Sequence, residues 1–291
     1  MGRFRLILGL PAPAKLNLFL HVVGRRDDGY HELQTAFVAI DLADTLDFEL
    51  RTDGRIERGG DLCGPAEDDL AVWAARLLQQ EAGSPLGASI QVVKAIPVGA
   101  GLGGGSSDAA TTLLALNRLW RLRWSREHLA ELAARLGADV PFFLQPGPAF
   151  GEGVGERLTP VALPRLWFAV VHPQVHVSTA EIFSDRALTR NTKPTTISGF
   201  SAAAQDLDRA PFGSNDLEPV VRRRVAEVDR ALELLGRFGV ARMTGSGSAV
   251  YSAFRTQAAA ERAVDAVRAS MPAHWSAWAV RGLGEHPLAA W

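Results

Sequence analysis

A glycine-rich segment at residues 94–108 is the part of this chain best suited to hold a phosphate group. Five glycines and two serines fill residues 99–107, between a β-branched run at residues 90–96 and an apolar run at residues 109–120. Glycine lets backbone N–H groups approach an anion without a Cβ in the way, and a helix start adds unpaired donors and a positive dipole. Ser106, Ser107 and Asp108 are expected at that helix start, where they can cap the helix or reach a metal ion. Strand, glycine loop and helix together predict a phosphate-binding loop rather than a flexible linker.

This loop differs from two common nucleotide-binding motifs. No Gly-Lys-Ser/Thr sequence ends it, so it is not a Walker A loop. Gly99, Gly101 and Gly104 fit the spacing of the dinucleotide-binding fingerprint, but that pattern alone is weak. No acidic residue ends a second strand about twenty residues later, as the fingerprint requires.

Two polar pairs in the first part of the chain could contribute chemistry. Lys15 and Asn17 put a cation and an amide at the start of a predicted strand, although a strand lysine more often lies on a solvated face. Tyr30 and His31 lie in a polar turn, and such a pair is more often a packing unit than a binding site. Tyr30 is one of only two tyrosines in the chain and does not lie on an apolar face, so the binding interpretation stays open.

Asp139 and a second glycine loop complete the candidates. Asp139 lies between a helix stop at Gly137 and an apolar Pro-Phe-Phe run, where partial burial is expected. Burying an unpaired carboxylate costs several kcal/mol, so Asp139 is a helix cap, a paired ion or a catalytic group. Residues 243–248, with the sequence MTGSGS, precede a predicted strand. Their successive N–H groups can form a second anion site or simply a tight turn.

Composition limits the class of protein and its partners. The chain has 291 residues, long enough for two domains of ordinary size, and its 47% hydrophobic and 22% charged residues are typical of a globular protein. Its 31 lysines and arginines are matched by 32 acidic residues, so no basic excess favours nucleic acid or an anionic membrane. The single cysteine, Cys63, excludes an internal disulfide and a cysteine-rich metal site. No run approaches 18 apolar residues, so a cytoplasmic protein is the simplest interpretation.

Hydrophobic periodicity predicts mixed strands and helices in two domains. Asp68 and Asp69 open a helix with Leu70, Trp73, Ala74, Leu77 and Leu78 on its inner face, and Ser125 caps another that ends at Gly137. Residues 190–205 are expected to form a loop. Strands are predicted at residues 16–23, twice within 36–50, and at 166–171, 249–254 and 275–280; further helices at 215–235 and 256–271. The expected class is α+β, with domains at residues 1–164 and 165–291.

Five motifs, in this order, resemble those of the GHMP superfamily of small-molecule kinases. They are PAKLNL at residues 13–18, RDDGYHELQ at 26–34, GAGLGGGSSDAA at 99–110, GADVPFF at 137–143 and MTGSGS at 243–248. The resemblance runs from about residue 11 to residue 254. It is most specific to the branch whose acceptor is a small molecule linked to cytidine diphosphate. Asp108 stands where some relatives carry Asn.

The resemblance implies a fold, a reaction and a site. The fold is an N-terminal domain like domain 2 of ribosomal protein S5 and a ferredoxin-like C-terminal domain, with the active site between them. ATP is the donor, with Mg²⁺, for which Ser107 is a candidate ligand. Asp139 would be the general base and Lys15 its neighbour, keeping the carboxylate ionised, while Asn17 would orient the hydroxyl or Lys15. The residues expected around the ATP phosphates are Pro97, Val98, Gly99, Ala100, Gly101, Leu102, Gly103, Gly104, Gly105, Ser106 and Ser107.

The resemblance also implies how the pyrimidine of the acceptor is held. Tyr30 matches a stacking residue, His31 a reader of the base edge, and Phe183 the opposite wall of the sandwich. Another GHMP kinase, such as a mevalonate-pathway or homoserine kinase, is disfavoured by these three residues because its acceptor carries no nucleobase. A catalytically dead nucleotide sensor is disfavoured by the presence of both Lys15 and Asp139. An RNA-binding protein is disfavoured by the balanced charge, and the oligomeric state is left open.

Overall fold

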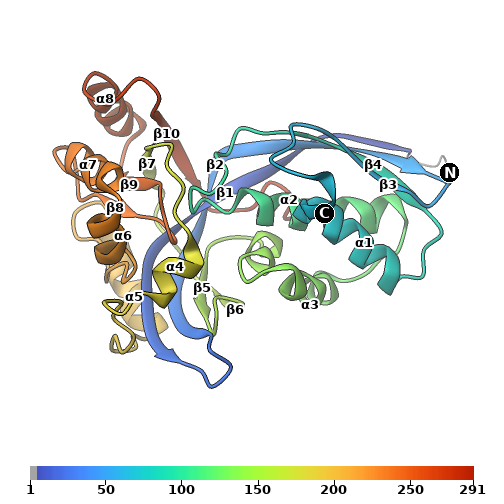
Figure 1. Cartoon of the computed structure of the whole chain (residues 1–291), viewed down its shortest axis with the longest axis horizontal. Helices are drawn as coiled ribbons and strands as arrows, with labels where there is room; N and C mark the ends of the chain where they lie inside the picture. Colours follow the sequence, from blue (N-terminus) through green and yellow to red (C-terminus); the bar gives the residue numbers. More distant parts are fainter. Residues whose placement is uncertain (1–4) are drawn as a thin grey trace.

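Two long antiparallel strands run through the whole molecule. The structure is a computed structural model and describes residues 5–291. Strand β1 (Leu6–Arg25) pairs with β2 (His31–Arg51) along nearly its full length, and Figure 1 shows this pair crossing from one end of the molecule to the other. The prediction of two short strands within residues 36–50 is wrong. The chain continues through Asp44 because its buried carboxylate is fully used, accepting hydrogen bonds from Ala95, Ile96 and Lys94.

The strands form one ten-stranded sheet. Along its main path the order is β3-β4-β2-β10-β7-β9-β8, with β1 and β5 also paired to β2, and β6 paired to β5. Only β3 and β4 are parallel among these pairs. The remaining strands are β3 (Ile56–Gly60), β4 (Gly87–Val93), β5 (Ala149–Glu152), β6 (Arg157–Pro160), β7 (Trp167–His172), β8 (Arg242–Met243), β9 (Val250–Phe254) and β10 (Ser276–Leu283). The prediction of strands at residues 166–171, 249–254 and 275–280 is therefore confirmed, to within three residues at each end.

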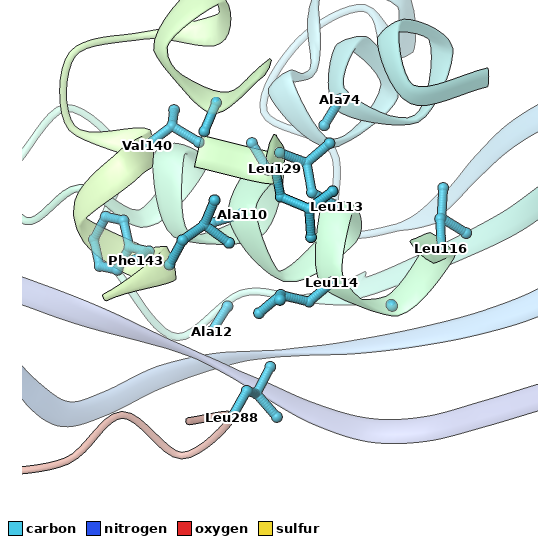
Figure 2. Close-up of a cluster of buried hydrophobic side chains, with 14 of the residues drawn as sticks. Ala12, Ala74, Ala110, Leu113, Leu114, Leu116, Leu129, Val140, Phe143 and Leu288 are labelled. Carbon is cyan, nitrogen blue, oxygen red and sulfur yellow. The ribbon is translucent and has the colours of Figure 1, made fainter. Parts of the chain in front are cut away.

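Three helices pack at one end of the sheet. They are α1 (Leu70–Glu81), α2 (Gly104–Leu119) and α3 (Arg126–Leu136), with short 3-10 turns η1 (Ala66–Asp68) and η2 (Val140–Leu144). Figure 2 shows Leu113 of α2 in one cluster with Leu129 of α3 and Val140 and Phe143 of η2. Ser125 caps α3, as predicted. Trp73 is an exception, because α1 buries Ala71, Val72, Ala74, Ala75 and Leu78 and leaves Trp73 46% exposed.

The other end carries shorter helices. They are α4 (Thr179–Ser184), α5 (Ile197–Ala203), η3 (Ala204–Asp206), α6 (Glu218–Arg224), α7 (Ala226–Leu235) and α8 (Gln257–Arg268). The prediction of a loop at residues 190–205 is wrong over α5. Thr196 caps this helix by accepting a hydrogen bond from the Gly199 N–H, and Phe200 is fully buried against the ring of Phe19. A single buried aromatic side chain in a polar segment gives no clear periodicity, which explains the error.

The long strands tie the two ends together. Leu20 and Val22 of β1 lie in the same buried cluster as Val171 and Leu217 from the second half of the chain. The α+β prediction is confirmed. The domain boundary between residues 164 and 165 falls in the connection from β6 to β7 and stays a prediction. Within residues 5–291, no helix is long and apolar enough to cross a membrane.

Candidate active site

The glycine loop is anchored on both sides before it turns. Asp44 Oδ1 on β2 accepts hydrogen bonds from the backbone N–H groups of Ala95 (2.6 Å) and Ile96 (2.8 Å). At the far end, helix α2 begins at Gly104, and its N-cap Gly103 has a left-handed conformation with φ 74°. The sequence suggested that Ser106, Ser107 and Asp108 could cap this helix. In the structure they lie inside it instead. The loop is thus fixed between a strand and a helix, as a preformed anion site requires.

Glycine is required where the two glycine loops meet. Gly101 has φ 76°, and a Cβ built on it would lie 2.5 Å from the carbonyl oxygen of Thr244 in the second loop. The Ala249 N–H donates to the Ala100 carbonyl (3.0 Å), and the Lys15 N–H donates to the Leu102 carbonyl (2.9 Å). The fold therefore brings β1, residues 97–107 and residues 243–248 into direct contact.

Lys15 and Asp139 form an ion pair at this junction. Lys15 Nζ lies 3.3 Å from Asp139 Oδ2 and donates a hydrogen bond to Asn17 Oδ1 at 2.5 Å. The Lys15 side chain is 3% exposed and that of Asp139 is 35% exposed. Asn17 is itself held, because its amide Nδ2 donates to Thr35 Oγ1 and its backbone N–H to Thr244 Oγ1, both at 2.9 Å. A buried cation is thus placed beside a carboxylate that solvent and a ligand can still reach.

Two cavities meet at the glycine loop. The loop cavity, about 520 Å³, is lined by nine of the eleven predicted phosphate-binding residues: Pro97, Val98, Gly99, Ala100, Gly101, Gly103, Gly104, Gly105 and Ser106. The lysine cavity, about 320 Å³, is lined by Lys15, Asn17, Asp139 and Phe183, among others. Gly101, Gly103, Ser106, Thr179 and Ser246 line both. A group held by the glycine loop at this shared wall would face the Lys15–Asp139 pair.

Leu102 and Ser107 line neither cavity. Both side chains are buried, and the Ser107 Oγ is fully enclosed without a hydrogen-bond partner. This placement does not support Ser107 as a metal ligand, because its oxygen lies within the helix packing rather than in the cavity. Ser106, one residue earlier, lines both cavities. Within the described part of the chain, no group of three or more His, Cys, Asp or Glu side chains could hold a metal ion by itself.

A second charged cluster, which the sequence did not suggest, lies on the wall of the loop cavity. Lys94 Nζ bridges Asp44 Oδ2 (2.5 Å) and Asp108 Oδ2 (2.8 Å). Burial raises the pKa of Asp108 to about 7, and the nearby Asp44 adds to the rise although Lys94 opposes it. Burial opposes the charge on Lys94, but the carboxylates of Asp108 and Asp44 raise its pKa above the usual value. Asp108 Oδ1 has no hydrogen-bond partner and Asp108 lines the loop cavity, so its charge state bears on any anion bound there.

His31 and Phe183 come together, 152 residues apart in the sequence. Their ring centroids lie 5.0 Å apart, at an interplanar angle of 32°. Arg190 Nε donates to His31 Nε2 at 3.0 Å, and Arg190 Nη2 donates to the carbonyl oxygens of Phe183 (2.9 Å) and Asp185 (2.7 Å). Burial lowers the pKa of His31, and Arg190 and Arg25 lower it further. The imidazole is therefore held neutral, with Nε2 as an acceptor and its proton on Nδ1.

Tyr30 is not brought to the same place. It lies in the turn between β1 and β2, where its carbonyl accepts from the Arg26 N–H and its N–H donates to Asp28 Oδ1. Its side chain is 66% exposed and lines neither cavity. The predicted sandwich of Tyr30 and Phe183 is thus not formed in this structure, in which His31 contacts Phe183 instead. The role assigned to Tyr30 stays a prediction.

Comparison with known proteins places this geometry in a family. The family model for the GHMP kinases N terminal domain matches residues 69–147, and that for the GHMP kinases C terminal domain matches residues 200–273. A protein of Burkholderia mallei (strain SAVP1) named 4-diphosphocytidyl-2-C-methyl-D-erythritol kinase is 53% identical over 283 residues, covering 96% of this chain and 95% of that protein.

Solved structures agree. A crystal structure of 4-(cytidine 5'-diphospho)-2C-methyl-D-erythritol kinase matches with a TM-score of 0.80 at 38% identity, covering 96% of this chain and all of that one. Homoserine kinase from Cytophaga hutchinsonii matches with a TM-score of 0.74 at 18% identity, covering 98% of this chain and 97% of that one. The second match extends to the fold alone, because its identity is low.

Proposed function

Because the chain belongs to the GHMP kinase family and, within it, to the 4-diphosphocytidyl-2-C-methyl-D-erythritol kinases, we propose that it transfers the γ-phosphoryl group of ATP to a hydroxyl of that cytidine diphosphate-linked compound. The acceptor is the 2-hydroxyl, and the products are the 2-phosphate and ADP. This reaction belongs to the non-mevalonate route to isoprenoid precursors, which fits the cytoplasmic location expected from the sequence. The observation that carries the proposal is the ion pair of Lys15 and Asp139 at the shared wall of the two cavities.

The two cavities divide the substrates between them. ATP occupies the loop cavity, with its phosphates against the backbone N–H groups of the glycine loop, and the acceptor occupies the lysine cavity. The γ-phosphoryl group then lies at the wall formed by Gly101, Gly103 and Ser106. Phosphoryl transfer needs an in-line approach of the hydroxyl oxygen to phosphorus, and separate binding of donor and acceptor on either side of one wall provides that alignment.

Asp139 and Lys15 act on the acceptor hydroxyl. As its oxygen bonds to the γ-phosphorus and the bond from phosphorus to the ADP oxygen breaks, Asp139 takes the proton. The Lys15 ammonium, 3.3 Å from Asp139, stabilises the negative charge that spreads over the transferred group. Asn17 holds the ammonium in place through its Oδ1 at 2.5 Å, because its own amide and backbone are fixed by Thr35 and Thr244.

The acceptor's base is read by a neutral imidazole and an aromatic ring. Phe183 lines the lysine cavity and contacts the His31 ring. The Nδ1–H of His31 donates to an acceptor atom on the cytosine edge, since Arg190 occupies Nε2. Stacking of a base on an aromatic ring is worth roughly 1–3 kcal/mol. A uracil would place a different pattern of donors and acceptors at the same edge and leave polar groups unpaired.

Mg²⁺ fits this site through the nucleotide rather than through a cage of side chains. The described residues hold no cluster that could bind a metal alone, and Mg²⁺ in kinases is commonly bound by phosphates, water and one or two protein oxygens. Ser106 lines both cavities, and its hydroxyl oxygen is the chain's candidate ligand for Mg²⁺. Bound Mg²⁺ would neutralise phosphate charge during transfer.

The proposal is tested by phosphorus NMR of the purified protein with ATP, Mg²⁺ and the cytidine diphosphate-linked acceptor. The expected result is ADP together with a new phosphomonoester signal on the acceptor. Mevalonate and homoserine serve as matched alternative acceptors. Turnover of either one, with none of the cytidine compound, would favour another GHMP kinase activity. Binding of ATP without turnover of any acceptor would favour a nucleotide sensor.

A further inference from the structure

A third cavity, remote from the active site, is lined by arginines. It has a volume of about 500 Å³ and lies where helix α2 ends and α3 begins, at the opposite end of α2 from the glycine loop. None of its lining residues lines the loop cavity or the lysine cavity. We call it the arginine cavity; its charged and aromatic residues are Arg118, Arg121, Arg123, Arg126, Trp124 and Trp291.

The charge in this cavity is one-sided. Four of its eleven lining residues are arginines and none has an acidic side chain. Arg118, Arg123 and Arg126 form no ion pair with a side chain of the described residues. Since the whole chain carries a formal net charge of −1, this concentration of cations is local rather than a reflection of composition. Such a pocket attracts anions.

Three of these arginines are used differently. Arg126 donates to the carbonyl oxygens of Leu144 (2.7 Å) and Ala289 (3.1 Å), so it serves the packing of the cavity wall. The Arg118 guanidinium lies over the Trp291 ring, 4.7 Å from its centroid, which leaves its N–H groups able to donate at the ring edge. Arg123 is exposed and has no side-chain partner among the described residues. Arg118 and Arg123 are therefore the two cations best placed to bind a ligand.

The turn after α2, which carries Arg121 and Arg123, is closed by a pair of hydrogen bonds. Asn117 Nδ2 donates to the Trp124 carbonyl and the Trp124 N–H donates back to Asn117 Oδ1, both at 3.0 Å. Within this closed loop Arg121 and Arg123 each have φ 60°, a left-handed conformation that costs a side-chain-bearing residue on the order of 1 kcal/mol or more. Glycine or asparagine would adopt this conformation at lower cost, so backbone preference does not explain why arginine occupies these two positions.

We propose that the arginine cavity binds a small molecule through a diphosphate or triphosphate group. A guanidinium offers paired donors that match phosphate oxygens, and Arg is favoured over Lys for this purpose. The indole rings of Trp124 and Trp291 provide apolar faces for a planar ring attached to the phosphates. The volume lies within the range of small-molecule sites. The proposal does not depend on the reaction at Lys15 and Asp139.

Calorimetric titration with inorganic tripolyphosphate tests it by counting sites. Arg118→Gln/Arg123→Gln is expected to bind one tripolyphosphate fewer than the unaltered chain, or to bind it at least tenfold more weakly at that site. The matched control is Arg209→Gln/Arg237→Gln, which removes two exposed arginines elsewhere and should keep every site. If the double variant fails to fold, Arg123→Gln alone serves, because that side chain has no partner to lose. An unchanged number of sites and affinity in the arginine-cavity variant, or an equal loss in the control, would overturn the proposal.

Further titrations distinguish the source of the phosphates. If the arginine-dependent site binds cytidine or adenosine triphosphate more tightly than tripolyphosphate, the ligand is a nucleotide whose ring contacts the indoles. If it binds tripolyphosphate and the two nucleoside triphosphates equally, the site recognises only the phosphate chain, whether of an inorganic polyphosphate or of a nucleotide. If it prefers inorganic phosphate to tripolyphosphate, the diphosphate or triphosphate assignment is wrong. The variant is expected to keep kcat within twofold, since none of its changes touches the two active-site cavities.

Discussion

Arg190 should control recognition of the acceptor without taking part in the reaction. Its side chain donates four hydrogen bonds, to His31 Nε2 (3.0 Å) and to the carbonyl oxygens of Leu188 (3.1 Å), Phe183 (2.9 Å) and Asp185 (2.7 Å). It therefore fixes both the tautomer of His31 and the backbone that carries Phe183. Arg190→Lys keeps the positive charge but replaces the planar set of donors with a single ammonium, which cannot hold all four partners in this geometry.

The expected loss of acceptor affinity follows from the side chains that Arg190→Lys would leave free to move. Ordering one side chain at a binding surface costs roughly 0.5–1.5 kcal/mol, and two recognition groups, His31 and Phe183, would have to be ordered by the acceptor instead of by Arg190. The sum, about 1–3 kcal/mol, predicts a rise of about 5-fold to 150-fold in the acceptor's dissociation constant. Steady-state kinetics with both substrates varied should show a raised KM for the acceptor, with kcat and the KM for ATP within about twofold. Calorimetry with the acceptor checks that the KM change reflects binding.

Two further variants test whether Arg190 positions the His31 imidazole. Arg186→Lys is the matched control, because Arg186 is exposed and its side chain forms no hydrogen bond or ion pair among the described residues. His31→Ala should reproduce the rise in acceptor KM and weaken discrimination against a uridine analogue. If His31→Ala has this effect and Arg190→Lys has none, Arg190 does not position the imidazole. If Arg190→Lys raises both KM values and lowers the melting temperature, its role is structural.

Three further substitutions probe the reaction, the buried charge and the loop. Asp139→Asn should lower kcat by roughly 10²–10⁴ while calorimetry shows unchanged ATP binding; a near-normal kcat would leave Asp139 only the ion pair with Lys15. Asp108→Asn should flatten the pH dependence of the melting temperature: burial raises the pKa of Asp108 from 3.8 to about 7, so its contribution to stability is full below about pH 4 and is lost as pH rises through 7. The same fall in melting temperature between pH 5 and 8 in both proteins would contradict this. Gly101→Ala should destabilise the fold by about 1–3 kcal/mol and raise the KM for ATP, since its Cβ would lie 2.5 Å from a carbonyl oxygen at φ 76°; Gly284→Ala, with open space around it, should do neither.

Local signals in the sequence were sufficient for much of the fold and for the location of the glycine loop. The cap at Ser125 and the apolar run of β7 depend on neighbouring residues, and both predictions are confirmed. Lys15 and Asp139 were identified by motif, and the structure brings them within 3.3 Å although 124 residues separate them. The position of one relative to the other was not readable from periodicity, because it depends on how β1 passes beneath the glycine loop.

Other site residues gave weak signals or none. Two strands were predicted within residues 36–50, where the structure has one; it continues because three donors satisfy the buried carboxylate of Asp44. Arg190 lay at the edge of a segment expected to be loop, where an arginine has no distinctive spacing. Its partners His31 and Phe183 lie in distant segments, so only tertiary structure reveals the contact. Ser107 was predicted as a metal ligand; the register of α2, which begins at Gly104, buries this side chain, and the role stays a prediction.

The burial of Lys15 fits the proposed role in catalysis better than a role in stability alone. A lysine side chain only 3% exposed loses most of its hydration, and a buried ion pair often returns no net stability against an apolar pair of similar size. Here the two partners are also unequally buried. Asp139 remains 35% exposed, so solvent at its carboxylate screens part of the attraction. A device for stability alone would enclose both partners. A cation held by Asn17, beside a carboxylate left open to a cavity and next to a loop of backbone donors, instead suits the proposed mechanism, in which charge arrives with a phosphate group and moves during transfer.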